Sequence, residues 1–159
     1  MSANVSFASR ALKLDDYLPY RLSVAANAVS QLVARAYAER FGLQPQQWRL
    51  LAVLGEDGAC TQQQLGVRTV MDKVTVMRAA RVLEQRKLVR REPNAADGRS
   101  HRLLLTAAGK RMYREISPLA LEYESLLLTG MSETSVRQLD RSLRALQATA
   151  ITLARIKPP

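Results

Sequence analysis

The stretch that decides the fold is residues 61–87, TQQQLGVRTVMDKVTVMRAARVLEQRK, which predicts two short helices in tandem. The first begins with a capping box, because the Thr61 hydroxyl can accept the amide of Gln64 while the Gln64 side chain reaches back. Asp72 is a preferred N-cap residue and predicts the start of the second helix. Two capped helices joined by a tight turn indicate a helix-turn-helix, whose second helix presents its N-terminal residues to the major groove of DNA.

The second of these helices has an apolar back and a basic front. At about 100° per residue, the residues expected to be buried share one side: Val76, Ala79, Ala80 and Leu83. The opposite side carries Val74, Arg78, Arg81 and Gln85. The major groove of B-DNA is about 12 Å wide and admits one helix, so this front suits that groove.

Residues 92–106, EPNAADGRSHRLLLT, follow the second helix and predict a hairpin. LVRRE (88–92) and HRLLL (101–105) have the composition of strands, and Asp97-Gly98 supplies a turn in the loop 93–100. Such a wing can reach the adjacent minor groove, which is about 6 Å wide. We expect Arg99 to enter it, because a narrow minor groove has an enhanced negative potential; the alternative is a solvated loop arginine.

Longer helices are expected on both sides of this module. Apolar periodicity predicts one helix from Asp15 to Arg40 and a shorter one in PQQWRLLAVLGEDG (45–58), and Thr106 and Ser132 can cap two more. The last helix repeats apolar residues as a heptad. These stripes exceed what a small winged core can cover, so burial against a second copy of the chain is expected. A twofold dimer predicts a palindromic site with half-sites about 34 Å apart.

The predicted fold is therefore mostly α with a small β wing. The expected divisions are an N-terminal arm (1–14), a helical dimerisation region (15–42 and 107–157) and a winged helix-turn-helix region (43–106). The formal net charge is +10, and residues 61–111 hold twelve Lys or Arg against four Asp or Glu. This concentration is the electrostatic footprint of a nucleic-acid binder. An aromatic content of 5% argues against a stacking platform for single strands.

Little in the sequence supports catalysis. A single His, a single Cys and the absence of GxSxG, P-loop or metal-spaced motifs predict no enzyme activity, no cofactor and no metal. We expect the lone Cys60 to be buried in a short strand beside the wing, the alternative being a redox role. The sequence has no signal peptide and no apolar run of about 20 residues, so we expect a cytoplasmic protein.

Residues 61–110 resemble the winged-helix core of the MarR (multiple antibiotic resistance regulator) family. The most specific element is the wing, Asp97-x-Arg99 followed by Leu105-Thr106-x-x-Gly109. The resemblance extends over residues 15–155 and implies an obligate homodimer that regulates transcription, usually as a repressor released by a small ligand. Val70 and Lys87 depart from the family pattern, which commonly has glycine at both positions.

Ten residues are the candidate DNA contacts: Gln62, Gln63, Lys73, Val74, Thr75, Arg78, Arg81, Asp97, Arg99 and Arg102. Arg78 is expected at a base edge or a phosphate, and Asp97 is expected to orient the Arg99 guanidinium and brace the wing. Val74 either touches a thymine methyl or is a plain surface valine, and His101 either touches a phosphate or is solvated. Three further arginines are expected to be surface charge: Arg86, Arg90 and Arg91.

A candidate ligand site lies in the first two helices. LDDYLPYRLS (14–23) looks like the family branch that senses aromatic carboxylic acids. The resemblance implies a pocket drawn from Tyr17, Tyr20, Arg21, Ser23, Asn27 and Trp48. Arg21 would pair with a carboxylate; the alternatives are an inter-subunit ion pair for Arg21 and a core position for Trp48. A rival function is an architectural DNA-binding protein without an effector, whose affinity would be nearly independent of sequence.

Overall fold

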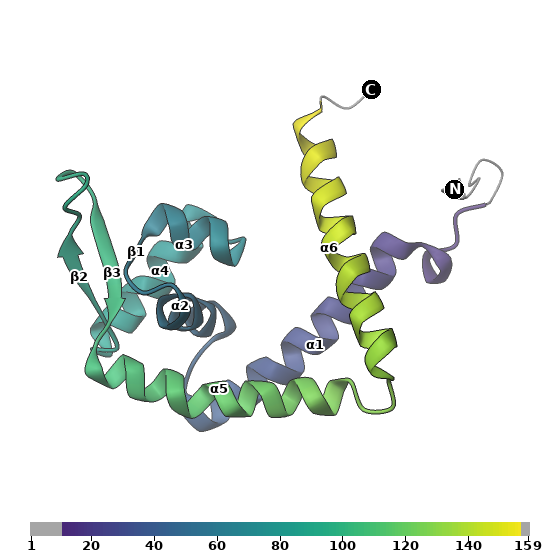
Figure 1. Cartoon of the computed structure of the whole chain (residues 1–159), viewed down its shortest axis with the longest axis horizontal. Helices are drawn as coiled ribbons and strands as arrows, with labels where there is room; N and C mark the ends of the chain where they lie inside the picture. The colour runs from purple at the N-terminus through teal and green to yellow at the C-terminus, as the bar shows by residue number, and fades with distance from the viewer. Residues whose placement is uncertain (1–10, 157–159) are drawn as a thin grey trace. The chain divides into compact units, whose positions relative to one another are not determined.

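The computed structural model describes residues 11–156 (Figure 1). The chain divides into two compact units, one ending at Ser117 and the other beginning at Pro118. It is mostly α with a small antiparallel sheet, as predicted. The first ten residues of the predicted arm and position 157 of the predicted dimerisation region lie outside the described residues. No helix among residues 11–156 is long and apolar enough to cross a membrane.

The first unit begins with a 3-10 turn, η1 (Leu14–Asp16), followed by α1 (Leu18–Phe41) and α2 (Pro45–Glu56). The prediction of a helix beginning at Asp15 was wrong in its first turn. Pro19 lacks an N–H, and its ring would clash with the carbonyl of Asp15 in a continuous helix. The chain therefore enters α1 through an extended residue at position 17. Gly42 ends α1 in the left-handed region, with φ of 60°, as predicted.

The helix-turn-helix consists of α3 (Gln62–Thr69) and α4 (Lys73–Gln85). The predicted capping box of α3 is confirmed, since Gln64 N donates to Thr61 Oγ1 at 3.2 Å and Thr61 N donates to Gln64 Oε1 at 2.8 Å. Asp72 caps α4 by accepting the Thr75 amide at 2.9 Å. The predicted buried side of α4 is also confirmed: Val76, Ala79, Ala80 and Leu83 are at most 5% exposed.

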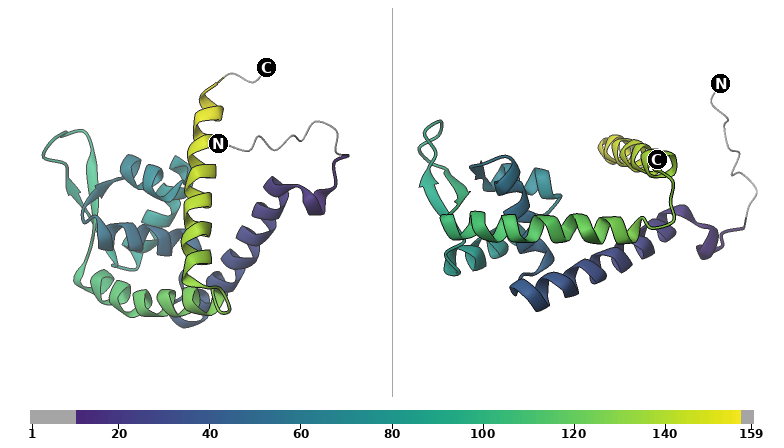
Figure 2. Two further views of the ribbon diagram at one scale, coloured as in Figure 1. Left: turned by 45° about the vertical axis from the view of Figure 1, so that its right-hand side comes forward. Right: turned by 60° about the horizontal axis from the view of Figure 1, so that its bottom comes forward.

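A three-stranded antiparallel sheet in the order β1-β3-β2 forms the wing and its base. The strands are β1 (Cys60–Thr61), β2 (Val89–Pro93) and β3 (His101–Leu105). The β2–β3 hairpin extends away from the helices of its unit in every view (Figures 1 and 2). Cys60 is buried opposite Leu103, as expected for a packing residue. Burial raises the pKa of its thiol, which disfavours the reactive thiolate.

The core of the first unit joins α2, α3, α4 and the sheet. Its fully buried side chains include Leu50, Leu65, Leu83 and Leu103. Trp48 is half-buried between two tyrosines: its ring centroid lies 5.3 Å from Tyr37 and 6.1 Å from Tyr113. The leucine core packs the helix-turn-helix against the sheet, and the Trp48 contacts join α2 to α1 and α5.

α5 (Ala107–Leu127) leaves the wing through Thr106, and α6 (Glu133–Arg155) follows in the second unit. Ser132 caps α6 as predicted, by accepting the Ser135 amide at 3.1 Å. α6 has no buried residue, and the heptad positions Leu139, Leu143 and Leu146 are 42–45% exposed. In the first unit, the apolar stripe of α1 is likewise exposed at Val24, Val29 and Leu32.

Candidate nucleic-acid interface

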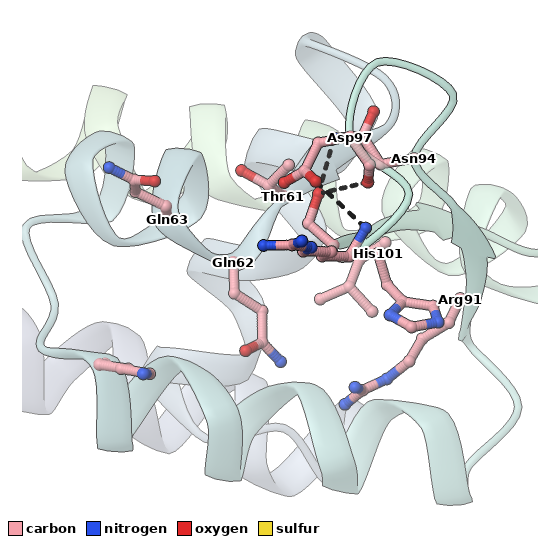
Figure 3. A pocket seen from close by; sticks show the side chains of 11 residues that line it. Thr61, Gln62, Gln63, Arg91, Asn94, Asp97 and His101 are labelled. Carbon is pink, nitrogen blue, oxygen red and sulfur yellow. Dashed lines mark hydrogen bonds between the residues drawn. The ribbon is translucent and has the colours of Figure 1, made fainter.

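A polar hollow of about 520 Å³ lies between the wing, the start of α3 and the start of α4. We call it the wing groove (Figure 3). Five of the predicted DNA contacts line it: Gln62, Gln63, Lys73, Asp97 and Arg99. His101 and Arg91 line it from the strands, and Figure 3 shows both side chains on the same side of the hollow. Residues separated by up to 42 positions in the sequence, from Thr61 to Leu103, thus converge on one groove.

The wing loop is braced mainly by its own backbone. Asp97 Oδ1 accepts the backbone N–H of Arg99 at 3.1 Å. Asn94 donates through its side-chain amide to Ser100 Oγ at 2.8 Å, and the two backbones also bond at 3.1 Å. Asp97 therefore braces the wing as predicted, but through the Arg99 amide rather than by orienting its guanidinium. Among the described residues the Arg99 guanidinium has no hydrogen bond or ion pair, so it is available to a ligand.

Side chains on the outward face of α4 line two different hollows. Lys73 lines the wing groove, whereas Thr75 and Arg78 line a second hollow of about 270 Å³ beside the start of α2. Three glutamines that were not among the predicted contacts also line that hollow: Gln44, Gln46 and Gln47. Between the two sides, the outward-facing residues of α4 include Val74 and Arg81, which are exposed.

Asp72 holds the first turn of α4 in place beneath these side chains. Its carboxylate accepts the Thr75 hydroxyl at 2.6 Å as well as the Thr75 amide. The hydrogen bond from the Thr75 side chain, followed by the one from its backbone, lowers the pKa of Asp72 below the ordinary 3.8. The Thr75 hydroxyl is therefore committed as a donor, but its oxygen retains the capacity to accept a hydrogen bond.

Arg102 lies apart from the other candidates. Its guanidinium donates to the carbonyl oxygen of Ala59, with Nε at 3.2 Å, and the side chain is half-buried. This contact ties β3 to the loop that precedes β1. Within the sheet, Arg102 is also the register partner of Thr61 in β1. The structure thus gives Arg102 a partner inside the protein.

Two arginines predicted to be surface charge are exposed, and each also has specific partners within the protein. Arg91 binds the Glu84 carboxylate through Nε at 2.6 Å and Nη2 at 3.0 Å. Arg86 donates to the carbonyls of Phe41 and Gly42 at 2.9 and 2.8 Å. Arg90 makes a longer ion-pair contact of 3.6 Å to Glu92.

The candidate ligand residues are less closely grouped. Tyr17, Tyr20, Arg21, Ser23 and Asn27 are exposed along the start of α1, and the Ser23 hydroxyl donates to the Pro19 carbonyl at 3.1 Å. Tyr17 lines an apolar hollow of about 430 Å³ with Leu12 and Leu18. Trp48 instead packs between Tyr37 and Tyr113, as its core alternative predicted.

Comparison with known proteins identifies the group to which this winged helix belongs. A family model described as the MarR family matches residues 41–100, which include α2, the helix-turn-helix and most of the wing. An uncharacterized HTH-type transcriptional regulator of Bacillus subtilis (strain 168), YwoH, is 30% identical over 110 residues, covering 67% of this chain and 80% of YwoH. The chain belongs to the MarR family. Its family and fold are those of transcription regulators with a DNA-binding winged helix.

Solved structures of MarR-family proteins extend the similarity to nearly the whole chain. A MarR/EmrR family transcriptional regulator from Acinetobacter sp. ADP1 is 26% identical, with a TM-score of 0.82 over 89% of this chain and 99% of that protein. MepR of S. aureus, solved as a DNA complex, has 23% identity and a TM-score of 0.76 over 84% of this chain and 98% of MepR. Bordetella bronchiseptica BpsR has 21% identity and a TM-score of 0.80 over 87% and 98% of the two chains. MepR and BpsR therefore have the same fold as this chain.

Proposed function

We propose that this MarR-family protein is a homodimeric repressor that binds a palindromic DNA site and is released by a small ligand. The observation that carries the proposal is the wing groove, in which an unpaired Arg99 faces the same hollow as Lys73 at the start of α4. A helix start and a cationic loop that line one groove can engage adjacent major and minor grooves of a duplex. MepR, which shares the fold, has been solved bound to DNA.

On such a duplex the candidate contacts have different tasks. Arg99 would insert into the minor groove, and Arg78 would bind a base edge or a phosphate from the α2 side of α4. Lys73 and Arg81 would contact phosphates, as would the two glutamines at the start of α3. Asp97 would act indirectly by holding the wing loop, and Arg102 would stabilise the base of the wing.

The uncovered apolar faces of α1 and α6 support a homodimer. Leucines and valines that are exposed to water contribute no hydrophobic stabilisation. A second copy of the chain could bury them, since they lie at regular helical spacing. Two copies related by a twofold axis would present two α4 helices to a palindrome, with half-sites about 34 Å apart.

The proposed effector is an aromatic carboxylic acid. BpsR is reported with a mechanism for regulation of its DNA binding by 6-hydroxynicotinic acid, a compound of this class. In this chain Arg21 is the candidate carboxylate partner, with Tyr17 and Tyr20 beside it on the exposed start of α1. Arg21→Ala should abolish the response of the DNA complex to an active aromatic acid while leaving DNA affinity unchanged. An unaltered response would remove Arg21 from the effector site.

Selection of duplexes from a randomised pool tests the DNA-binding proposal directly. The full chain should enrich a palindrome, and at a fixed salt concentration its Kd should be at least about 1000-fold lower than for a scrambled duplex. Equal affinity for both duplexes would instead favour the architectural alternative. Arg99→Ala should weaken the selected complex about tenfold, whereas Arg111→Ala, which removes the same charge from α5, should change the affinity by less than twofold.

A further inference from the structure

The exposed face of α4 has apolar side chains near its middle. Attraction between the protein's positive charges and DNA phosphates gives no reason for these side chains to be there. Val74 and Met77 are 49% and 47% exposed. At about 100° per residue, Val74 lies near the centre of the outward face, with Arg81 about 20° away. Arg78 lies about 40° to one side of Val74, and Met77 lies about 60° to the other. Cationic residues therefore flank a central strip that is apolar in the first two turns of the helix.

The surroundings of α4 support this arrangement. Lys73 faces the wing groove, and Thr75 and Arg78 face the hollow beside α2. Val74 lines neither hollow, and it lies between residues that do. Its side chain is 49% exposed and lies between the two hollows. In a helix that enters the major groove, residues in the first turn are those that contact base edges.

The bases offer one apolar feature at that position. In the major groove every base pair presents hydrogen-bond donors and acceptors, and only thymine adds a methyl group, at C5. A branched aliphatic side chain without donor or acceptor can discriminate bases there only through that methyl. We propose that Val74 selects T·A pairs by contact with the thymine 5-methyl group.

This inference rests on the proposed function, because it requires α4 to enter the major groove. It goes further by naming the chemical group that is read and the residue that reads it. A protein partner that docks on Val74 and Met77 would be a different explanation for the same exposed side chains, and it predicts no dependence on the thymine methyl.

Deoxyuridine provides the test, since it pairs with adenine like thymidine and lacks only the 5-methyl group. Each thymine of the selected duplex is replaced in turn, and Kd is measured at one salt concentration with the full chain. At one or two positions in each half-site the replacement should weaken binding about three- to fourfold, the usual value of one buried methyl group. In Val74→Ala the same positions should tolerate uracil with less than a 1.5-fold change.

Val67→Ala is the matched control, because Val67 is 76% exposed but lies on α3. It should retain the full difference between thymine and uracil. Uracil tolerance at every position in the wild-type chain, or a methyl effect that persists in Val74→Ala, would overturn the inference while leaving the proposed function standing. Failure to select any preferred duplex would overturn the proposed function itself, and the inference with it.

Discussion

Arg86 at the end of α4 donates from Nη1 to the carbonyl oxygen of Gly42, 44 residues earlier in the chain, at 2.8 Å. A second bond from Nη2 reaches the carbonyl of Phe41 at 2.9 Å. These carbonyls end α1 and carry the partial negative charge of a helix C-terminus, which a guanidinium complements. The helix proposed to read DNA is thus joined directly to the helix that bears the candidate effector residues.

Replacing Arg86 tests how much this contact contributes to stability. Arg86→Met keeps most of the aliphatic chain and removes both donors, and it should lower the free energy of unfolding by about 1 kcal/mol, because the bonds are charge-assisted but solvent-exposed. The midpoint of urea unfolding measures the change. Arg81→Met is the control, since Arg81 makes no hydrogen bond or ion pair within residues 11–156, and its midpoint should be unaltered. Equal midpoints for both variants would show that the contact contributes nothing measurable.

Gly109 is required by a close approach of two backbones. A Cβ at this position would lie 2.0 Å from the carbonyl oxygen of Leu88, which is main chain and cannot rotate away. Thr106 Oγ1 holds the same junction by accepting the Gly109 amide at 3.1 Å and donating to the Lys87 carbonyl at 2.7 Å. Gly109→Ala should therefore destabilise the protein by about 3 kcal/mol, at the upper end of overpacking effects.

Gly98→Ala provides the contrast for Gly109, because nothing lies within 4 Å of a Cβ at position 98 and its backbone needs no positive φ. Its free energy of unfolding should change by less than about 0.5 kcal/mol. Chemical denaturation of the two variants side by side measures the difference. A Gly109→Ala protein as stable as Gly98→Ala would mean that α5 does not approach Leu88 this closely.

The cap of α4 gives stability a pH dependence of known sign. Hydrogen bonds from Thr75 lower the pKa of Asp72 in the folded protein, so the cap is at full strength above the unfolded value of 3.8 and is lost as the pH falls through the folded value. Asp72→Ala should lower Tm by a few degrees at pH 7. The difference from wild type should shrink below about pH 4.

Thermal melts of both proteins between pH 7 and pH 3 measure this effect. Asp57 and Asp140 also have lowered pKa values, because Arg68 and Arg144 donate hydrogen bonds to them. Their contribution is common to wild type and variant and cancels in the difference. Asp72→Asn, which retains a capping side chain without a titrating group, should show an intermediate Tm at pH 7. A difference that stays constant over the whole range would contradict an ionised cap.

The helix caps of this fold could be predicted from the sequence, because each cap involves residues only a few positions apart. The capping box of Thr61 and Gln64, the N-cap at Asp72 and the start of α5 at Thr106 depend on neighbouring backbone groups. The buried side of α4 follows from periodicity alone. Gln62, Lys73 and Arg99 were each predicted as DNA contacts, but their convergence on one hollow depends on the assembled fold.

The roles of individual arginines could not be predicted in this way. Arg86 contacts residues 44 and 45 positions away, and Arg102 contacts Ala59 across 43 positions. Such contacts exist only after the elements have assembled. The sequence does not show whether an arginine guanidinium is solvated or hydrogen-bonded. The same limit applies to Trp48, whose two aromatic neighbours come from α1 and α5.

Val70 and Lys87, which stand where the family pattern commonly has glycine, are the non-glycine residues with positive φ in the described part of the chain, at 54° and 58°. This conformation costs an L-residue about 1–2 kcal/mol. Val70 is 79% exposed, so its side chain recovers little by burial. Val70→Gly should therefore raise the free energy of unfolding by about 1 kcal/mol, the relief of strain being partly offset by the greater freedom of glycine in the unfolded chain.

Val70→Ala separates strain from side-chain size. Alanine keeps the Cβ that is disfavoured in the left-handed region, so this variant should gain much less stability than Val70→Gly although it loses most of the same side chain. Differential scanning calorimetry should place Val70→Gly about 2–4 °C above wild type. If Val70→Gly melts at or below the wild-type temperature, the turn between α3 and α4 does not hold position 70 in the left-handed conformation.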